Sequence, residues 1–282
     1  MTTRALVRPR TVAEALALLD GEEEARPLAG GASLVAMMNA DLLSPSLLVS
    51  LRDIAELKGI SPAPGGGLRI GAMTRHYETA AAADLCGTLA VLRAAAGRIA
   101  NPPVRNMGTM GGSISLADPG ADYPAALVAL GARIEIASPA GTRLLPARDF
   151  FVDWYTTALK PGELVTAVLL PAPAGGIGLY HKLARVAGDF ATVSVALTAA
   201  PSGAVTLAIG GCGPFPIADA AADRELSGRL GDPAAARRAG EILAALADPV
   251  DDVRASADYR RLVIPRMVAR IAGEAAGWEK AA

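Results

Sequence analysis

Hydrophobic and polar positions near the start of the chain alternate between helical and strand spacing. Residues 11–14 fit a helix capping box, and residues 15–19 continue with apolar positions at helical spacing. Residues 27–29 predict a short strand that runs into two glycines, residues 34–39 a helix, and residues 47–51 a buried strand. This order of strand, loop, helix and strand predicts a small α/β unit.

A proline- and glycine-rich break at residues 62–67, either a hairpin tip or a subdomain seam, precedes a second run of elements. Thr74 is expected to cap a helix there. Asn101-Pro102-Pro103 is expected to end another, because proline cannot continue the helical hydrogen-bond pattern. The expected strands are residues 68–70, 132–137, 142–145 and 164–170, and the expected helices are residues 89–99 and 123–130.

The segment 171–176 is rich in proline, alanine and glycine and is the best linker candidate in the chain. Beyond it the pattern predicts strands near residues 178–186, 191–199 and 204–209, and then helices near 233–246 and 257–277. We therefore expect a domain over residues 1–175, with subdomains of about 1–58 and 59–175, and a C-terminal domain over residues 176–282.

Two glycine-rich segments carry the candidate chemistry, Ala29-Gly30-Gly31-Ala32-Ser33 and Thr109-Met110-Gly111-Gly112-Ser113. Glycine lets a backbone approach a phosphate closely and adopt positive φ, and a helix start behind such a loop adds its dipole. Each segment alone is equally compatible with a plain tight turn. Neither fits the usual dinucleotide or P-loop fingerprint. Together they indicate a pyrophosphate held from two sides.

The composition and charge of the chain argue against several other classes of binding function. The net charge of −1 leaves no electrostatic footprint for nucleic acid. The two cysteines, Cys86 and Cys212, are too few to hold an iron–sulfur cluster, and the two histidines are too few and isolated for a metal site. We expect neither a signal peptide nor a membrane span, and hence a cytoplasmic protein with reduced thiols.

Longer strings around the two segments are more specific. The first segment is followed by a strand over residues 47–51 and by Ile54-Ala55-Glu56-Leu57-Lys58-Gly59-Ile60. The second segment ends a longer string that begins Val104-Arg105-Asn106-Met107-Gly108 and runs to Ser113. Residues 117–127 follow this string. The chain thereby resembles the FAD-binding medium subunits of the xanthine oxidase family of molybdenum hydroxylases, particularly those of aerobic carbon monoxide dehydrogenases. The resemblance runs from near residue 5 to near residue 275.

The resemblance implies an α+β fold. It consists of a vanillyl-alcohol-oxidase (PCMH) type FAD-binding domain of two α/β subdomains and a C-terminal domain with a three-stranded antiparallel sheet and helices. The family usually has aspartate at Ser50 and glutamine or another polar residue at Pro103, and this chain departs from it at both positions. The residues implied to contact FAD are Ala29, Gly30, Gly31, Ala32, Ser33, Leu34, Thr109, Met110, Gly111, Gly112, Ser113, Asp122, Val165 and Lys182.

Several of these residues can also be explained by a purely structural role. Asp122 can instead be a helix N-cap, Val165 a buried strand residue and Lys182 an exposed strand lysine. Arg105 can contact phosphate, order its loop or form a structural salt bridge. Cys212 follows a strand in a turn and is expected to have no redox role.

The resemblance also implies a function. The protein would be the FAD-binding electron-transfer subunit of a heteromeric molybdenum hydroxylase, an oxidoreductase component. Its implied partners are a small subunit with two [2Fe–2S] clusters and a large subunit with a molybdenum–pterin cofactor, assembled as a dimer of heterotrimers (a heterohexamer). No catalytic acid, base, nucleophile or metal ligand is assigned to this chain. The alternatives are a stand-alone flavoprotein oxidoreductase of the same fold and a scaffold protein that has lost FAD.

Overall fold

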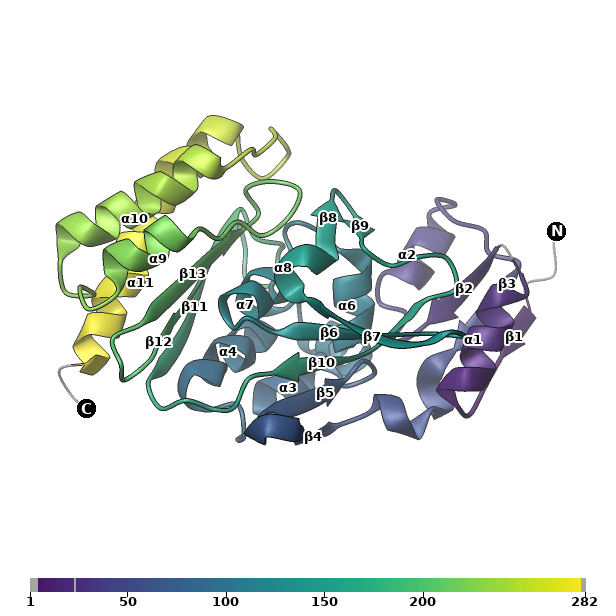
Figure 1. The fold of residues 1–282 in the computed structure, drawn as a ribbon. Helices are drawn as coiled ribbons and strands as arrows, with labels where there is room; N and C mark the ends of the chain where they lie inside the picture. Colours follow the sequence, from purple (N-terminus) through teal and green to yellow (C-terminus); the bar gives the residue numbers. More distant parts are fainter. Residues whose placement is uncertain (1–4, 23, 280–282) are drawn as a thin grey trace.

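The computed structural model describes residues 5–22 and 24–279. Residues 1–4, where a signal peptide would begin, lie outside this range, so the expected absence of such a peptide stays a prediction. Three bodies follow one another along an elongated molecule, from the N-terminal elements at one end to the C-terminal helices at the other (Figure 1). This arrangement and its mixed helices and strands agree with the α+β fold expected from the sequence.

The first body is the expected α/β unit. Its elements are β1 (Ala5–Val7), α1 (Val12–Asp20), β2 (Ala25–Leu28), α2 (Leu34–Asn39), β3 (Leu47–Ser50) and the short 3₁₀ turns η1 (Leu51–Asp53) and η2 (Ala55–Leu57). The three strands pair in parallel in the order β1-β3-β2. Thr11 caps α1 as the sequence predicts, because its hydroxyl accepts the Glu14 N–H. In a parallel sheet all C-terminal strand ends meet at one edge, so the loop after β2 lies at that edge.

The second body is built on a five-stranded antiparallel sheet, in the order β4-β5-β10-β6-β7. Its strands are β4 (Ile60–Pro62), β5 (Leu68–Gly71), β6 (Arg133–Ser138), β7 (Gly141–Pro146) and β10 (Leu164–Leu170), with a separate small ribbon of β8 (Phe151–Asp153) and β9 (Thr156–Thr157). Its helices are α3 (His76–Ala81), α4 (Ala90–Arg98), α5 (Pro102–Met107), α6 (Met110–Leu116), α7 (Tyr123–Ala129) and α8 (Ala147–Phe150), with 3₁₀ turns η3 (Pro64–Gly66) and η4 (Gly87–Leu89). The break at residues 62–67 is a hairpin tip between β4 and β5.

One local prediction in this body is wrong, and another is incomplete. Thr74 does not cap α3, because Arg75 is the residue that precedes the helix and the Thr74 hydroxyl donates to the Gly59 carbonyl instead, 2.9 Å away. The helix expected before Asn101-Pro102-Pro103 does end there, because α4 stops at Arg98, but these residues also begin α5, which was not predicted. The Asn101 side chain accepts the Val104 N–H, and Pro102 stands at the first helical position, where a missing N–H costs nothing.

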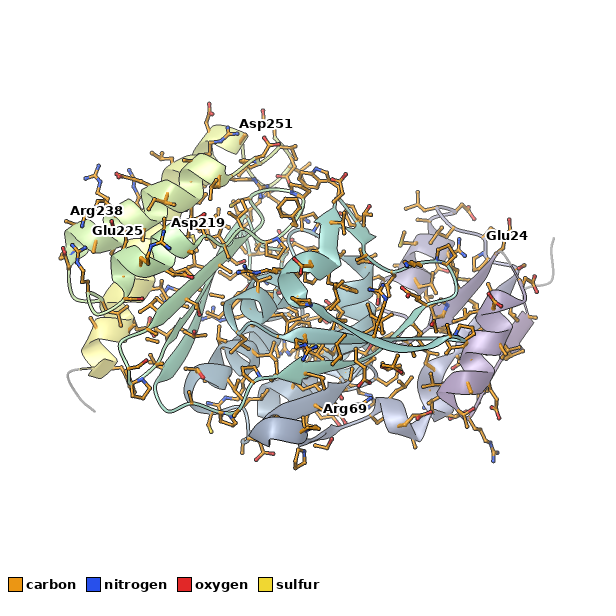
Figure 2. The ribbon with its side chains drawn as sticks, viewed as in Figure 1. Glu24, Arg69, Asp219, Glu225, Arg238 and Asp251 are labelled. Carbon is orange, nitrogen blue, oxygen red and sulfur yellow. The ribbon has the colours of Figure 1, made fainter. Side chains whose placement is uncertain are left out.

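The third body is the C-terminal sheet and its helices, as expected. The strands β11 (Ile177–Leu183), β12 (Val193–Ala199) and β13 (Val205–Gly210) are antiparallel, and α9 (Ala220–Leu226), α10 (Pro233–Leu246) and α11 (Ala257–Glu279) follow them. Figure 2 shows the surface side chains of α9 and α10, where Glu225 pairs with Arg238. The segment 171–176 carries neither helix nor strand, and the domain boundary near residue 175 stays a prediction.

Both faces of the C-terminal sheet are buried. Val193, Val195 and Leu197 of β12 point into a core formed with α9, α10 and α11. Ala196 of β12 and Ala208 of β13 point the other way, into the core of the second body. Their small side chains let α7 lie close against the sheet, so the second and third bodies share one apolar interface.

Candidate cofactor site

The first glycine-rich segment is a tight connection between β2 and α2. Gly31 has φ of +78°, which favours glycine, and a Cβ added to Gly30 would lie 1.8 Å from the Met107 carbonyl oxygen. Gly30 therefore lets the first body touch the end of α5. Within the described residues, the backbone N–H groups of Gly31, Ala32 and Ser33 donate no hydrogen bond, so they are available to an anion.

The second segment is not a loop, contrary to the expectation, but the first turn of α6. Thr109 is its N-cap, and its hydroxyl accepts the Gly112 N–H at 3.2 Å. The Met110 and Gly111 N–H groups donate to the Thr74 and Ala72 carbonyls. The amides of this segment are thus already used, and what it offers a ligand is a smooth glycine surface and its hydroxyls.

The two segments face each other across one cleft of about 370 Å³, within the range of small-molecule sites. The residues expected to contact the cofactor that line it are Ala29, Gly30, Gly31, Ala32, Ser33, Leu34, Thr109, Gly112, Ser113 and Asp122. The residues expected to contact the cofactor that do not line it are Met110, Gly111, Val165 and Lys182.

The contacts of these four residues place them outside the lining of the cleft. Met110 is fully buried, and a Cβ on Gly111 would lie 2.5 Å from the Ala72 Cβ, so the helix packs directly on β5's end. Val165 is buried in β10 opposite Ile136. Lys182 reaches the wall from the C-terminal sheet and contacts Asp122 from behind.

Asp122 and Lys182 form a buried ion pair, with Nζ 3.0 Å from Oδ2 and each side chain only 5% exposed. Asp122 occupies the N-cap position of α7, but its side chain makes no capping hydrogen bond. Its Oδ1 instead accepts the Tyr180 hydroxyl at 2.8 Å. Burial raises the pKa of Asp122, although Lys182, Tyr180 and Arg98 act in the opposite direction.

His76 lines the cleft as well, although no role there was expected for it. Its Nδ1 lies 3.0 Å from the Tyr123 hydroxyl, and it is almost fully buried. Burial, with a smaller contribution from Arg105, lowers the pKa of His76 to about 4, so the imidazole is neutral at physiological pH. Arg105 itself donates to the Ile99 and Ala100 carbonyls, which identifies it as a residue that orders the loop before α5.

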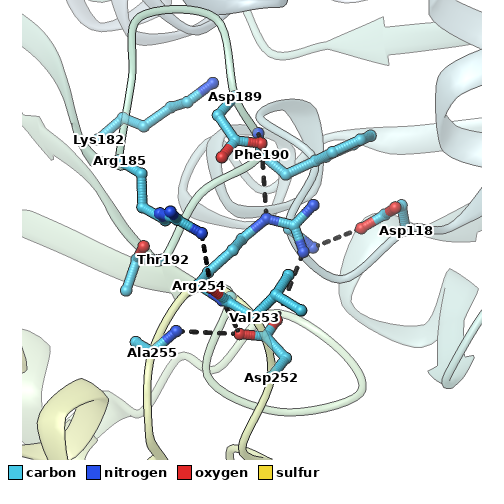
Figure 3. A network of polar contacts seen from close by, with 12 residues as sticks. Asp118, Lys182, Arg185, Asp189, Phe190, Thr192, Asp252, Val253, Arg254 and Ala255 are labelled. Atoms are coloured by element: carbon cyan, nitrogen blue, oxygen red, sulfur yellow. Dashed lines mark hydrogen bonds and ion pairs between the residues drawn. The ribbon is translucent and has the colours of Figure 1, made fainter.

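The far end of the cleft is closed by Gly188, Asp189 and Phe190, which follow β11 and were not predicted. Figure 3 shows Arg254, from the loop before α11, placed among these residues. Its guanidinium lies 5.4 Å from the centre of the Phe190 ring, and its Nε lies 3.5 Å from Asp189 Oδ1. Nothing in the local sequence marks this wall, because its parts lie more than sixty residues apart.

Asp252 holds the Arg254 loop in place. It accepts the N–H groups of Arg254 and Ala255 and a 2.6 Å bond from Arg260. Burial acts in the opposite direction, yet these donors lower the pKa of Asp252 to about 2. Cys212 lies apart from the cleft, and burial raises the pKa of its thiol to about 12, so it stays protonated.

This arrangement fits a dinucleotide. Free amides at Gly31 to Ser33 suit a pyrophosphate, and glycines on both walls leave room for it. Apolar side chains and the Phe190 ring suit a flat aromatic group. The residues present therefore match the chemistry of FAD.

Comparison with known proteins gives the same result over the whole chain. The family model described as the FAD binding domain in molybdopterin dehydrogenase matches residues 2–173. The model described as the CO dehydrogenase flavoprotein C-terminal domain matches residues 178–275.

Individual relatives are similar over nearly their full length. The carbon monoxide dehydrogenase medium chain of Afipia carboxidovorans is 40% identical over 93% of both chains, and the xanthine dehydrogenase FAD-binding subunit of Escherichia coli O157:H7 is 30% identical over 95% and 94%. A solved structure of Cu,Mo-CO dehydrogenase superposes with a TM-score of 0.91 at 37% identity, covering 98% of both chains. Quinoline 2-oxidoreductase from Pseudomonas putida 86 gives 0.91 at 32% identity, also covering 98% of both.

Proposed function

Because the chain belongs to the FAD-binding medium subunits of the molybdenum hydroxylases, we propose that it passes electrons from iron–sulfur clusters of a partner subunit to an external acceptor. The chain is an oxidoreductase component with FAD as its cofactor, and it is the medium subunit of a complex with small and large subunits. The observation that carries the proposal is the shared cleft whose opposite walls are formed by the two glycine-rich segments.

The proposed FAD contacts follow from the walls of the cleft. The free amides of Gly31, Ala32 and Ser33 would bind the pyrophosphate, with Ala29, Gly30 and Leu34 shaping that wall. Thr109, Gly112 and Ser113 would form the opposite wall, and Met110 and Gly111 would support it from behind. Asp122 would face the cofactor directly, and Lys182 would act on the cofactor only through its ion pair with Asp122. The contact between Val165 and the cofactor stays a prediction.

FAD supplies the ability to accept electrons singly and donate them in pairs, and the protein's own residues position and enclose it. The neutral His76 and the apolar side chains of the lining would lie along the walls around the cofactor. Arg254 fixes the wall residue Phe190 and thereby limits how an acceptor approaches. Oxygen, a quinone, a cytochrome and NAD are all acceptors compatible with this arrangement.

We further propose the partners. The small subunit would carry two [2Fe–2S] clusters, the large subunit a molybdenum–pterin cofactor, and the assembly would be a dimer of heterotrimers. The substrate would be hydroxylated on the large subunit. The free thiols Cys86 and Cys212 suit the reducing cytoplasm, where we place the complex.

Expression with the neighbouring genes for the small and large subunits tests the proposal. We expect one complex that contains all three chains and shows the visible absorbance of flavin. A lone chain that oxidises a substrate without partners would instead support the stand-alone oxidoreductase. A chain that stays colourless after FAD is added, alone and in the complex, would overturn the flavin assignment.

A further inference from the structure

The Asp122–Lys182 pair separates two cavities. Asp122 lines the cleft, whereas Lys182 lines a second groove of about 450 Å³ between α4, β11 and α11, called here the β11 groove. The remaining residues of this groove include Arg98, Tyr180, His181, Arg270 and Glu274. The wall between the cleft and the groove is therefore, at this point, one hydrogen-bonded ion pair.

The hydrogen bonds of the pair are directional. Lys182 Nζ donates to Asp122 Oδ2 and to the Arg98 carbonyl, each at 3.0 Å. Tyr180 donates to Asp122 Oδ1. A carboxylate can accept about four hydrogen bonds, so these two bonds leave acceptor capacity on Asp122 for a group in the cleft.

The proposed function requires protons as well as electrons to reach the flavin. Full reduction of a flavin takes up two electrons and one or two protons. Iron–sulfur clusters deliver electrons one at a time and deliver no protons with them. The protons must therefore come from water, either through the mouth of the cleft or through groups in its wall.

We propose that Lys182 and Asp122 relay protons between the β11 groove and the flavin cleft. Nζ passes a proton to Asp122 Oδ2 and regains one from water in the groove, while the carboxyl passes its proton to the cofactor. For each pair of electrons from the iron–sulfur clusters, one or two protons move inward and the ion pair returns to its starting state. When a cytochrome removes only electrons, the same two groups return the protons to the groove, whereas NAD, a quinone or oxygen carries hydrogen away with the electrons. The relay rests on the proposed function, since it requires FAD in the cleft.

The surroundings of the pair favour proton exchange. Burial raises the pKa of Asp122, so its carboxylate binds a proton more readily than a surface aspartate does. Burial also raises the pKa of Tyr180 well above its usual value, so this hydroxyl remains a donor. The charged and titratable groups that face the pair or line the groove are Tyr180 and His181 from β11, Arg98 from α4, and Arg270 and Glu274 from α11.

The experiment uses the assembled complex, or the FAD-loaded chain, with a chemical one-electron reductant that brings no proton. Proton uptake is followed with a pH indicator by stopped flow. In Lys182→Gln, which keeps a neutral N–H donor, and in Lys182→Met, we expect uptake to slow about 100-fold. Small primary amines should restore the rate in Lys182→Met, an effect that a purely structural role would not produce.

Arg270→Met is the matched control, because Arg270 lines the same groove without any hydrogen bond to the pair, and its uptake rate should stay unchanged. Wild-type rates in both Lys182 variants with FAD bound would overturn the relay alone. Failure of the wild-type chain and complex to bind FAD would instead overturn the proposed function.

A second measurement needs no cofactor. In the FAD-free chain, infrared difference spectra follow the carbonyl band of protonated Asp122 with pH, and Asp122→Asn identifies the band. Lys182→Gln should move its midpoint to higher pH, because the cation that favours the carboxylate is gone. An unchanged midpoint would show that the two groups do not share a proton and would contradict the relay.

Discussion

At the scale of single residues, the glycines of the cleft serve different purposes. Gly30 permits contact between two bodies, Gly111 permits α6 to pack on Ala72, and Gly112 faces the cleft. A Cβ on Gly112 would lie 3.0 Å from the Thr109 hydroxyl and 3.5 Å from the Ala29 Cβ, so a side chain there would project into space that a ligand needs. Gly112 therefore tests cofactor binding with a smaller clash than Gly30 or Gly111, although the Thr109 hydroxyl that caps α6 must shift.

Gly112→Val should weaken FAD binding about 100-fold, equivalent to about 3 kcal/mol, while the FAD-free protein keeps its fold. Titration followed by flavin fluorescence and circular dichroism measures the two effects. Gly97→Val is the control, because Gly97 lies in α4 with nothing within 4 Å of an added Cβ. Unchanged FAD affinity in Gly112→Val would show that this face of α6 does not contact the cofactor.

His76 should make the FAD-free protein less stable in acid. Its folded pKa of about 4 lies below the 6.5 of free histidine, so the unfolded chain binds the proton first as pH falls. The stabilising contribution is complete above pH 6.5 and is lost toward pH 4, by about 3 kcal/mol. Urea unfolding across this window should show a shallower pH dependence in His76→Gln than in the wild type, and equal slopes would contradict the assignment.

At the scale of elements, the sequence predicted the helices and strands with regular periodicity, but two helix starts that contain glycine or proline were missed. The range of α2 and the three C-terminal strands follow from spacing and turn residues. The start of α5 has a local signal, because Asn101 caps it and proline is favoured at the first helical position. The start of α6 depends on a tertiary contact as well, because the Ala72 carbonyl accepts the Gly111 N–H. The motif residues of the site were likewise predictable, but the wall at Phe190 was not, because it depends on long-range packing.

The contact of the β2–α2 loop with the end of α5 gives a prediction for these elements. Gly30→Ala would place a methyl group 1.8 Å from the Met107 carbonyl, so the first body must move away. We expect a loss of about 1–3 kcal/mol in unfolding free energy, and the separation of the cleft walls should also abolish FAD binding. Chemical denaturation and flavin content measure both losses. Wild-type values for both would show that the two elements do not touch.

At the scale of the whole molecule, the second and third bodies are joined by charge as well as by apolar packing. Asp122 and Lys182 lie 60 residues apart, on opposite sides of the expected linker, yet their side chains are equally buried. The apolar side of this junction is the layer of alanines between the C-terminal sheet and α7. Neither contact was deducible from local sequence, because each depends on how the two bodies dock.

Lys182→Met should therefore destabilise the entire protein, by about 3–5 kcal/mol, because it leaves a buried carboxylate without its cation. The double variant Asp122→Asn/Lys182→Met should lose less than the sum of the single variants, which a double-mutant cycle in urea measures. Strictly additive losses would mean that the pair contributes no coupling across the junction.

The location of Tyr180 and Lys182 just beyond the linker has a practical consequence for protein engineering. A chain trimmed at residues 171–176 would contain both glycine-rich segments but would lack the two side chains that complete the cleft wall behind Asp122. The flavin-binding half is thus not a portable module. Grafting it into another redox enzyme would require transplanting the first strand of the following sheet along with it.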